Sequence, residues 1–126
     1  MQSNISIANK TKGKLPRLPF ARLKNAILKE GYDLSIVFVS PAESHRLNLT
    51  YRKKDKPTNV LSFPLSKNSG ELILDIKTSS LDAKNFDMTP QKFLLYLVIH
   101  GMLHLKGLDH GSTMDKQEKK FLKIFS

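Results

Sequence analysis

The longest helix of this 126-residue chain is predicted within residues 89–110, which read TPQKFLLYLVIHGMLHLKGLDH. Thr89 before Pro90 is a typical helix start, and Gly107 is a typical helix end. Ten of the thirteen residues from Phe93 to Leu105 are apolar. Because a helix that is apolar on nearly every side must be buried, this helix is predicted to run through the middle of the fold.

Shorter patterns before and after this helix predict the other elements. Helical spacing of apolar residues covers residues 20–30, 40–51 and 113–125, and short apolar or β-branched runs cover residues 34–39, 59–63 and 71–76. Ser40, Pro41 and Glu43 form a capping box with proline at the first helical position. These elements predict an α/β (α+β) fold, a single compact domain over residues 1–126 with a sheet of about four strands packed against helices.

The composition excludes several classes of protein. The chain has no cysteine, so it holds neither a disulfide framework nor a thiolate metal site. Its longest wholly apolar run, residues 93–99, has seven residues, whereas a membrane-spanning helix needs roughly 20. The N-terminus is polar and lacks the apolar segment of a signal peptide. We therefore expect a soluble, cytoplasmic protein without a membrane partner.

Basic residues are concentrated in the N-terminal half of the chain. The formal net charge is +10, and residues 1–56 hold twelve Lys and Arg against four Asp and Glu, whereas residues 57–126 contribute only +2. A field of that sign concentrates polyanions near the surface, and nucleic acid is the commonest polyanion in a cell. The charge is equally compatible with a surface that is simply soluble. It therefore suggests a partner but names no reaction.

Three of the four histidines lie close together, at positions 100, 104 and 110. His100 and His104 are four residues apart, so both imidazoles project from one helix face, about 5–6 Å apart at Cβ. Two imidazole nitrogens at that separation can reach one metal ion at about 2.0–2.1 Å. Gly107 is free to adopt a positive φ and turn the chain, which brings His110 back toward the pair. Since a metal would satisfy all three polar rings, we predict a three-histidine metal site.

The donor set favours zinc, at one ion per chain, because neutral imidazole suits zinc and no soft ligand is present; nickel, copper and iron are alternatives. Three protein ligands are typical of catalytic zinc, whose fourth position is left for water or substrate. Asp109 could be a fourth ligand, but we expect it to orient an imidazole or to cap the turn. His45, on a predicted helix surface, is interpreted as unrelated to the metal.

The spacing H-x-x-x-H-x-x-G-x-x-H also occurs in metzincin proteases, where a glutamate follows the first histidine and acts as the general base. In this chain that position is Gly101, which has no proton acceptor. The predicted metal geometry is therefore metzincin-like, whereas the protease mechanism lacks its base.

Longer motifs reveal a resemblance to a known family. Residues 100–110 match H-G-x-L-H-L-x-G-x-D-H at every fixed position, and residues 47–64, LNLTYRKKDKPTNVLSFP, match L-N-x-x-Y/W-R-x-K-x-x-x-T-D/N-V-L-S-F-P. Gly70 and Glu71 before a strand match a third motif, G-D/E. From about Ser40 to its C-terminus the chain thus resembles the YbeY family of bacterial metal-dependent endoribonucleases, which act in ribosomal RNA maturation.

The resemblance implies a compact α/β domain, zinc held by His100, His104 and His110, and RNA as the substrate, with ribosome-associated proteins as partners. It also implies that Arg52 faces the metal across a cleft. A guanidinium there can donate two hydrogen bonds to a phosphoryl group whose oxygens gain charge in the transition state. Two alternatives remain for the general base, a metal-activated water and the 2′-hydroxyl group of the RNA.

Three lysines next to the proposed catalytic arginine are candidates for RNA binding. Lys53, Lys54 and Lys56 could hold flanking phosphates, although a solvated loop is an equal alternative. The chain departs from the family pattern at Asn59 and Glu71, where aspartate is commoner.

Two other functions compete with an endoribonuclease. One is a different metal hydrolase, such as a peptidase or an esterase; the absence of a base at Gly101 and the basic charge both argue against it. The other is an RNA- or ribosome-binding assembly factor whose metal is only structural. The open fourth coordination position argues against that function.

Overall fold

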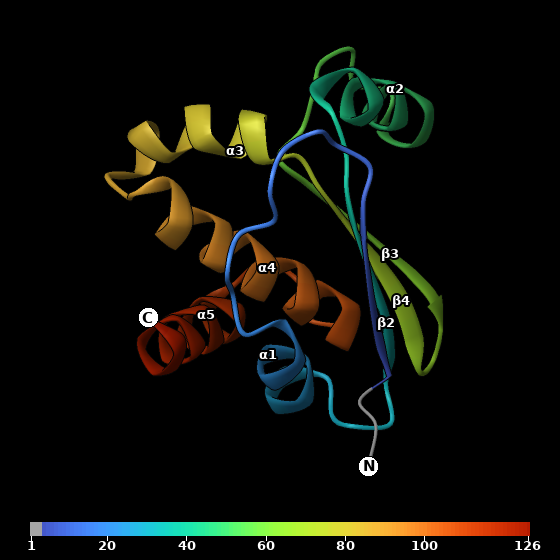
Figure 1. The fold of residues 1–126 in the computed structure, drawn as a ribbon. Coiled ribbons are helices and arrows are strands. Elements are labelled where there is room, and N and C mark those ends of the chain that lie inside the picture. Colours follow the sequence, from blue (N-terminus) through green and yellow to red (C-terminus); the bar gives the residue numbers. More distant parts are fainter. Residues whose placement is uncertain (1–3) are drawn as a thin grey trace.

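The computed structural model describes residues 4–126 and has an α/β architecture, as predicted (Figure 1). The strands are β1 (Ile5–Asn9), β2 (Asp33–Phe38), β3 (Val60–Ser66) and β4 (Ser69–Leu74), in one sheet of order β1-β2-β4-β3. The helices are α1 (Phe20–Ile27), α2 (Pro41–Arg52), α3 (Ile76–Asp82), α4 (Pro90–Lys106) and α5 (Ser112–Phe125), with a short 3-10 helix η1 (Ala83–Phe86). No helix in this part of the chain has both the length and the apolar character to span a lipid bilayer.

The direction of the strands determines where the helices begin. β1, β2 and β4 run parallel, so their carboxyl ends lie at the same end of the sheet. α2 and α3 both start there, as Figure 1 shows. β3 lies at the edge of the sheet and pairs antiparallel with β4, and a tight turn at Lys67 and Asn68 joins the two strands. One side of β3 packs against α4.

α4 is the central helix of the fold, as its sequence predicts. Helices α1, α3, α4 and α5 lie on one face of the sheet (Figure 1), and most of α4 is buried. Alternate residues of β2, namely Leu34, Ile36 and Phe38, are fully buried in the same core. Gly101 lets α4 approach the sheet closely, because a Cβ atom there would lie only 2.7 Å from the Cδ2 atom of Leu72.

α2 covers part of the opposite face of the sheet. Its Leu47 packs on a second apolar cluster, which consists of Val39, Leu61 and Ile73. Burial of these apolar side chains holds α2 against β3 and β4. As a result, the last turn of α2, which ends at Arg52, lies beside the edge strand.

Three elements, β1, α3 and the short 3-10 helix η1, were not predicted from the sequence. β1 lies at the sheet edge and most of its residues are exposed, and its alternation of apolar and polar residues, Ile5 to Ile7, is too short to indicate a strand. The strand predicted over residues 71–76 ends at Leu74, because the Asp75 carboxylate accepts a hydrogen bond from the Thr78 N–H at 2.9 Å and caps α3.

The helix predicted over residues 20–30 is shorter than expected and ends at Ile27. The buried Lys24 side chain donates a hydrogen bond from Nζ to the carbonyl oxygen of Glu30 at 2.6 Å. This bond is made with a backbone that has already left the helix, since Lys29 has a φ of 81°. The chain therefore turns before Gly31, where the sequence pattern had placed the end.

Candidate metal centre

Three histidines come together at the C-terminal half of α4. His100 and His104 project from one face of the helix, and His110 follows the turn after it. Gly107 makes this turn with a φ of 108°, the left-handed conformation that the sequence predicts. Each histidine offers one ring nitrogen, and the three nitrogens lie within 4.8 Å of one another.

Hydrogen bonds at Nδ1 orient two of the three rings. His104 donates from Nδ1 to the carbonyl oxygen of Leu108 at 3.1 Å. His100 donates from Nδ1 to the carboxylate of Glu118. Because carbonyl and carboxylate oxygens only accept, the Nδ1 atom carries the proton in both rings. The Nε2 lone pairs are therefore free to bind a metal ion.

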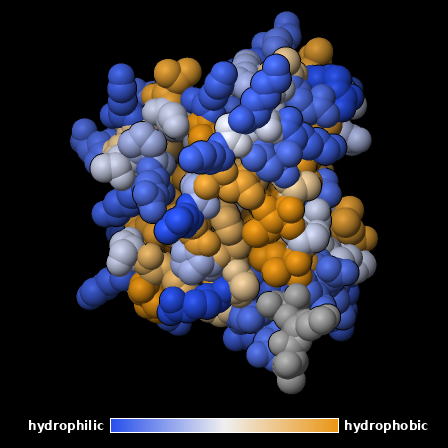
Figure 2. All heavy atoms as spheres, in the orientation of Figure 1, coloured by the Kyte–Doolittle hydropathy of each residue, from blue (hydrophilic) through white to orange (hydrophobic). Residues whose placement is uncertain are grey.

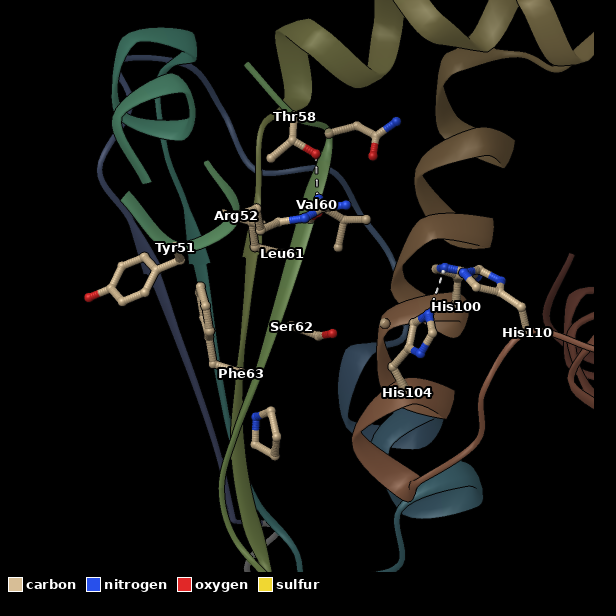
Figure 3. A pocket seen from close by; sticks show the side chains of 13 residues that line it. Tyr51, Arg52, Thr58, Val60, Leu61, Ser62, Phe63, His100, His104 and His110 are labelled. Carbon is tan, nitrogen blue, oxygen red and sulfur yellow. Dashed lines mark hydrogen bonds between the residues drawn. The ribbon is translucent and has the colours of Figure 1, made fainter. Parts of the chain in front are cut away.

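The Nε2 atoms of His100 and His104 converge as metal ligands do. They lie 3.1 Å apart (dashed line in Figure 3), close to the ~3.3 Å that separates two nitrogens on a tetrahedral zinc ion. Burial lowers the pKa of His104, and the neighbouring His100 and His110 rings lower it further. His104 is thus neutral at pH 7, the form that a metal requires. Three imidazoles without a thiolate are a donor set that fits zinc.

Glu118 on α5 is a site residue that the sequence analysis missed. Its side chain is only 10% exposed, and it contacts His100 on the ring edge away from the Nε2 atom. Tyr96 lies one helical turn before His100; burial raises the pKa of its hydroxyl, and the Glu118 carboxylate raises it further. A signal did exist in the sequence. Glu118 lies between Met114 and Phe121 on the buried face of α5, where a carboxylate needs a polar partner.

The histidines form one wall of a cleft of about 590 Å³. The opposite wall consists of Tyr51 and Arg52, at the end of α2, and residues 58–64, which lead into and along β3. In Figure 3 the Arg52 side chain extends past β3 toward the histidines, and Ser62 points from β3 into the space between the walls. Arg52 and the three histidines therefore share one cleft, although they lie far apart in the sequence.

A family match covers almost the whole chain. The family model described as Endoribonuclease YbeY matches residues 2–125. The chain belongs to the YbeY family. Two proteins named Endoribonuclease YbeY, from Acinetobacter baumannii and Finegoldia magna, are 36% and 37% identical to it. Their alignments cover 90% and 75% of this chain, and 79% and 69% of the relatives.

A solved structure supports the same assignment. The solution structure of TM1509 from Thermotoga maritima matches this chain with a TM-score of 0.66 and 31% sequence identity. The match covers 94% of this chain and 87% of that protein. The resemblance to YbeY endoribonucleases and the predicted fold class are thus confirmed. Membership of this family makes the chain a nuclease that acts on RNA.

The remaining predicted site residues lie outside the cleft of this YbeY-family protein. Lys53, Lys54 and Lys56 are exposed in the loop after α2, and none of them lines the cleft. The Asn48 side chain holds this loop through a hydrogen bond from Nδ2 to the Lys56 carbonyl oxygen at 2.9 Å. Asp109 is also exposed, and within residues 4–126 no hydrogen bond joins its side chain to an imidazole. The carboxylate that contacts a histidine comes from α5 instead.

Two further residues bear on the alternatives. Gly101 lines the cleft at the position where metzincins have their glutamate, and a Cβ atom there would lie 2.7 Å from the Cδ2 atom of Leu72, so a side chain would require Leu72 to shift. The position therefore supplies no protease base, and it packs closely on the sheet instead. His45 is hydrogen-bonded through Nε2 to the Asp55 carboxylate at 2.6 Å and does not line the cleft.

Proposed function

We propose that this chain is a zinc-dependent endoribonuclease that cuts single-stranded segments of ribosomal RNA or its precursors. Residues 1–126 would act as one catalytic domain in ribosomal RNA maturation and ribosome biogenesis. The observation that carries the proposal is the placement of Arg52 and three converging imidazoles in one cleft. The family's endoribonuclease activity supports the reaction class.

His100, His104 and His110 are the proposed ligands of one zinc ion. When bound, zinc would polarise a phosphoryl oxygen and lower the pKa of a water molecule toward about 7. The Leu108 carbonyl and the Glu118 carboxylate hold two of these rings with Nε2 directed toward the third histidine. The rings therefore need little rearrangement to bind the ion.

Arg52 is the proposed catalytic residue. Its side chain is exposed at the end of α2 and extends into the cleft, so it is free to meet a phosphodiester there. As the phosphorus becomes five-coordinate, its oxygens gain negative charge, and a planar guanidinium can stabilise that charge through two parallel hydrogen bonds. Lys53, Lys54 and Lys56 follow directly and are proposed to hold neighbouring phosphates from outside the cleft.

An exposed aromatic side chain supports a single-stranded substrate. Tyr51 lines the cleft and is 64% exposed, and its ring packs edge-to-face on Phe63 at a centroid distance of 5.1 Å. Aromatic rings of this kind stack with unpaired bases, whose faces are hidden in a duplex. Tyr51 and Phe63 lie on the side of β3 away from the histidines (Figure 3), so the pair would hold a base of the RNA strand where it leaves the cleft beside Arg52.

The experiment that tests the proposal is cleavage of purified precursor ribosomal RNA. We expect cutting that disappears when the metal is removed by a chelator and returns when one metal is added, with zinc tested first and nickel, copper and iron after it. A His104→Ala variant purified in the same way controls for contaminating nucleases. Tight RNA binding without cutting by the zinc-loaded protein would contradict the proposal and favour an assembly factor, and ribosome-associated proteins would then be its natural partners.

A further inference from the structure

A second groove lies at the other end of α2, away from the histidines. It has a volume of about 410 Å³, and four lysines line it: Lys10, Lys12 and Lys14 in the loop after β1, and Lys77 in α3. All four lysines are exposed, and within the described residues 4–126 no acidic residue lines the groove. The charge of this surface is therefore complementary to an anion.

The loop that carries three of these lysines is ordered by its own hydrogen bonds. The Asn9 side chain donates from Nδ2 to the Gly13 carbonyl oxygen at 2.8 Å, and its Oδ1 atom accepts from the Thr11 hydroxyl at 2.6 Å. The Lys10 N–H donates to the Phe38 carbonyl oxygen at 2.9 Å and extends the pairing of β1 with β2. Because the backbone is already held, a ligand bound here loses little affinity to the ordering of the loop.

The floor of the groove is apolar and its rim is basic. Val39, Pro41 and Ile76 lie between the lysines. Single-stranded RNA has the matching chemistry, since its phosphates pair with ammonium groups while its unpaired bases contact apolar surface. The Glu43 carboxylate lies near Lys10, but it is occupied by two hydrogen bonds of 2.8 Å from the Arg46 guanidinium.

α2 connects this groove to the metal cleft. Ser40, the N-cap of α2, lines the groove, and Arg52, its last residue, lines the cleft. The helix has 12 residues and is therefore about 18 Å long. Arg46 and Thr50 are exposed between the two ends of α2. Figure 2 shows a largely hydrophilic surface at the top right of the view, where α2 lies in Figure 1. A single strand that passes Arg52 can thus continue along α2 to the lysines.

We propose that Lys10, Lys12, Lys14 and Lys77 form a second binding site for the phosphate backbone of single-stranded RNA. The site would hold the part of the RNA that flanks the segment in the metal cleft. That this RNA is also a substrate rests on the proposed function, but binding to the groove does not depend on cleavage. A long RNA would therefore bind more tightly than a short one.

The test compares two lengths of single-stranded 2′-O-methyl RNA, about 4 and about 16 nucleotides, whose integrity is checked after each measurement. The variant is K10Q/K12Q/K14Q in the metal-loaded protein. We expect its affinity for the long RNA to fall at least tenfold, while its affinity for the short RNA stays within twofold. The slope of log K against log salt for the long RNA should become shallower by roughly 2, since each phosphate contact on a single strand contributes about 0.7.

A matched control removes the same charge elsewhere. Lys84, Lys92 and Lys123 are exposed and line neither the groove nor the metal cleft. The variant K84Q/K92Q/K123Q should bind the long RNA with nearly wild-type affinity and salt dependence. Equal losses in the two variants would overturn the proposal, because the lysines would then act only through the general field of the protein.

Two other measurements separate this proposal from the proposed function. A wild-type protein that binds both lengths with the same affinity has no second site, whether or not it cuts RNA. Conversely, a length-dependent gain that needs Lys10, Lys12 and Lys14 supports the groove even if no RNA is cleaved. K10Q/K12Q/K14Q should cut a short ribosomal RNA fragment at the wild-type rate, since it leaves the histidines and Arg52 intact.

Discussion

The two walls of the metal cleft are built in different ways. Two of the three rings on the histidine wall, His100 and His104, belong to α4, the most buried helix, and are held from behind by Glu118 and Leu108. On the opposite wall Arg52 is exposed at the end of a helix that packs on the other face of the sheet. Metal ligands must be held to a fraction of an ångström, whereas a group that receives RNA must remain accessible. Substitutions on the histidine wall should therefore affect metal binding, whereas substitutions on the opposite wall should affect how RNA is cleaved.

The largest effect is expected on the histidine wall. His100→Ala, His104→Ala and His110→Ala should each abolish stoichiometric metal binding. Each variant keeps only two of the three protein ligands, which is fewer than a zinc site uses. Elemental analysis of the purified variants measures this. The melting temperature of the metal-loaded preparation should also fall, since a ligand that binds only the folded state stabilises it. His45→Ala is the control and should keep the full metal content; a site variant that also keeps it would remove that histidine from the site.

On the opposite wall, substitution of Arg52 should lower the rate of RNA cleavage and little else. Arg52→Ala is expected to lower the single-turnover cleavage rate about 10²–10³-fold, because the guanidinium stabilises charge that appears only in the transition state. Arg52→Lys should recover little of this rate, since an ammonium lacks the planar pair of donors. RNA affinity, metal content and melting temperature should barely change.

A different outcome would change the role of Arg52. If Arg52→Ala weakens RNA binding while bound RNA is cut at the wild-type rate, Arg52 anchors a phosphate and does not act in the transition state. Lys53→Ala and Lys54→Ala would then be the next variants to test for the lost stabilisation.

Glu118 lies behind the histidine wall and is expected to affect the metal only through its hydrogen bond with His100. Glu118→Gln should weaken zinc binding about 10–100-fold in competition with a chelator, since a hydrogen-bonded carboxylate raises the basicity of its imidazole. Asp109→Asn is the matched control and should change zinc affinity by less than threefold. A larger effect of Asp109→Asn would favour the sequence-based assignment of Asp109 as the group that orients an imidazole.

The smallest effect is a pH dependence of the metal-free protein. The pKa of His104 is lowered in the folded state, mainly by burial, so the unfolded chain binds more protons as the pH falls below about 6.5. Stability is then lost as the pH falls through that range toward the folded-state pKa. The melting temperature should drop by a few degrees between pH 7.5 and 5.5. The drop should be smaller in His104→Gln, and an equal drop in both proteins would assign it to other groups.

Local patterns accounted for much of the fold. The start of α2 is one example, because Ser40 accepts a hydrogen bond from the Glu43 N–H at 3.2 Å as the capping box predicts. The end of α4 at Gly107 is another. Both depend on residues three or four positions apart, so they are visible in a single sequence. β1 was missed because this exposed edge strand buries little apolar surface and its alternation spans only Ile5 to Ile7.

In the metal site, too, local contacts were predicted and contacts between elements were not. The spacing of His100, His104 and His110 was sufficient to bring them together, since helix periodicity and one glycine turn determine it. Helical spacing with Met114 and Phe121 places Glu118 on the buried face of α5, but its partner His100 was not predictable, because that contact depends on how α5 packs against α4. Asp109 was the nearer carboxylate in sequence, yet it is exposed to solvent.

The sequence by itself therefore determined the central helix, the turn after it and the three-histidine group, because each follows from the periodicity and backbone freedom of neighbouring residues. The tertiary structure alone decided that Arg52 faces that group, that Glu118 supports it and that Gly101 packs closely on Leu72. Each of these contacts joins two different elements of the fold. Their distances are set by burial of a shared apolar core, which no local pattern encodes.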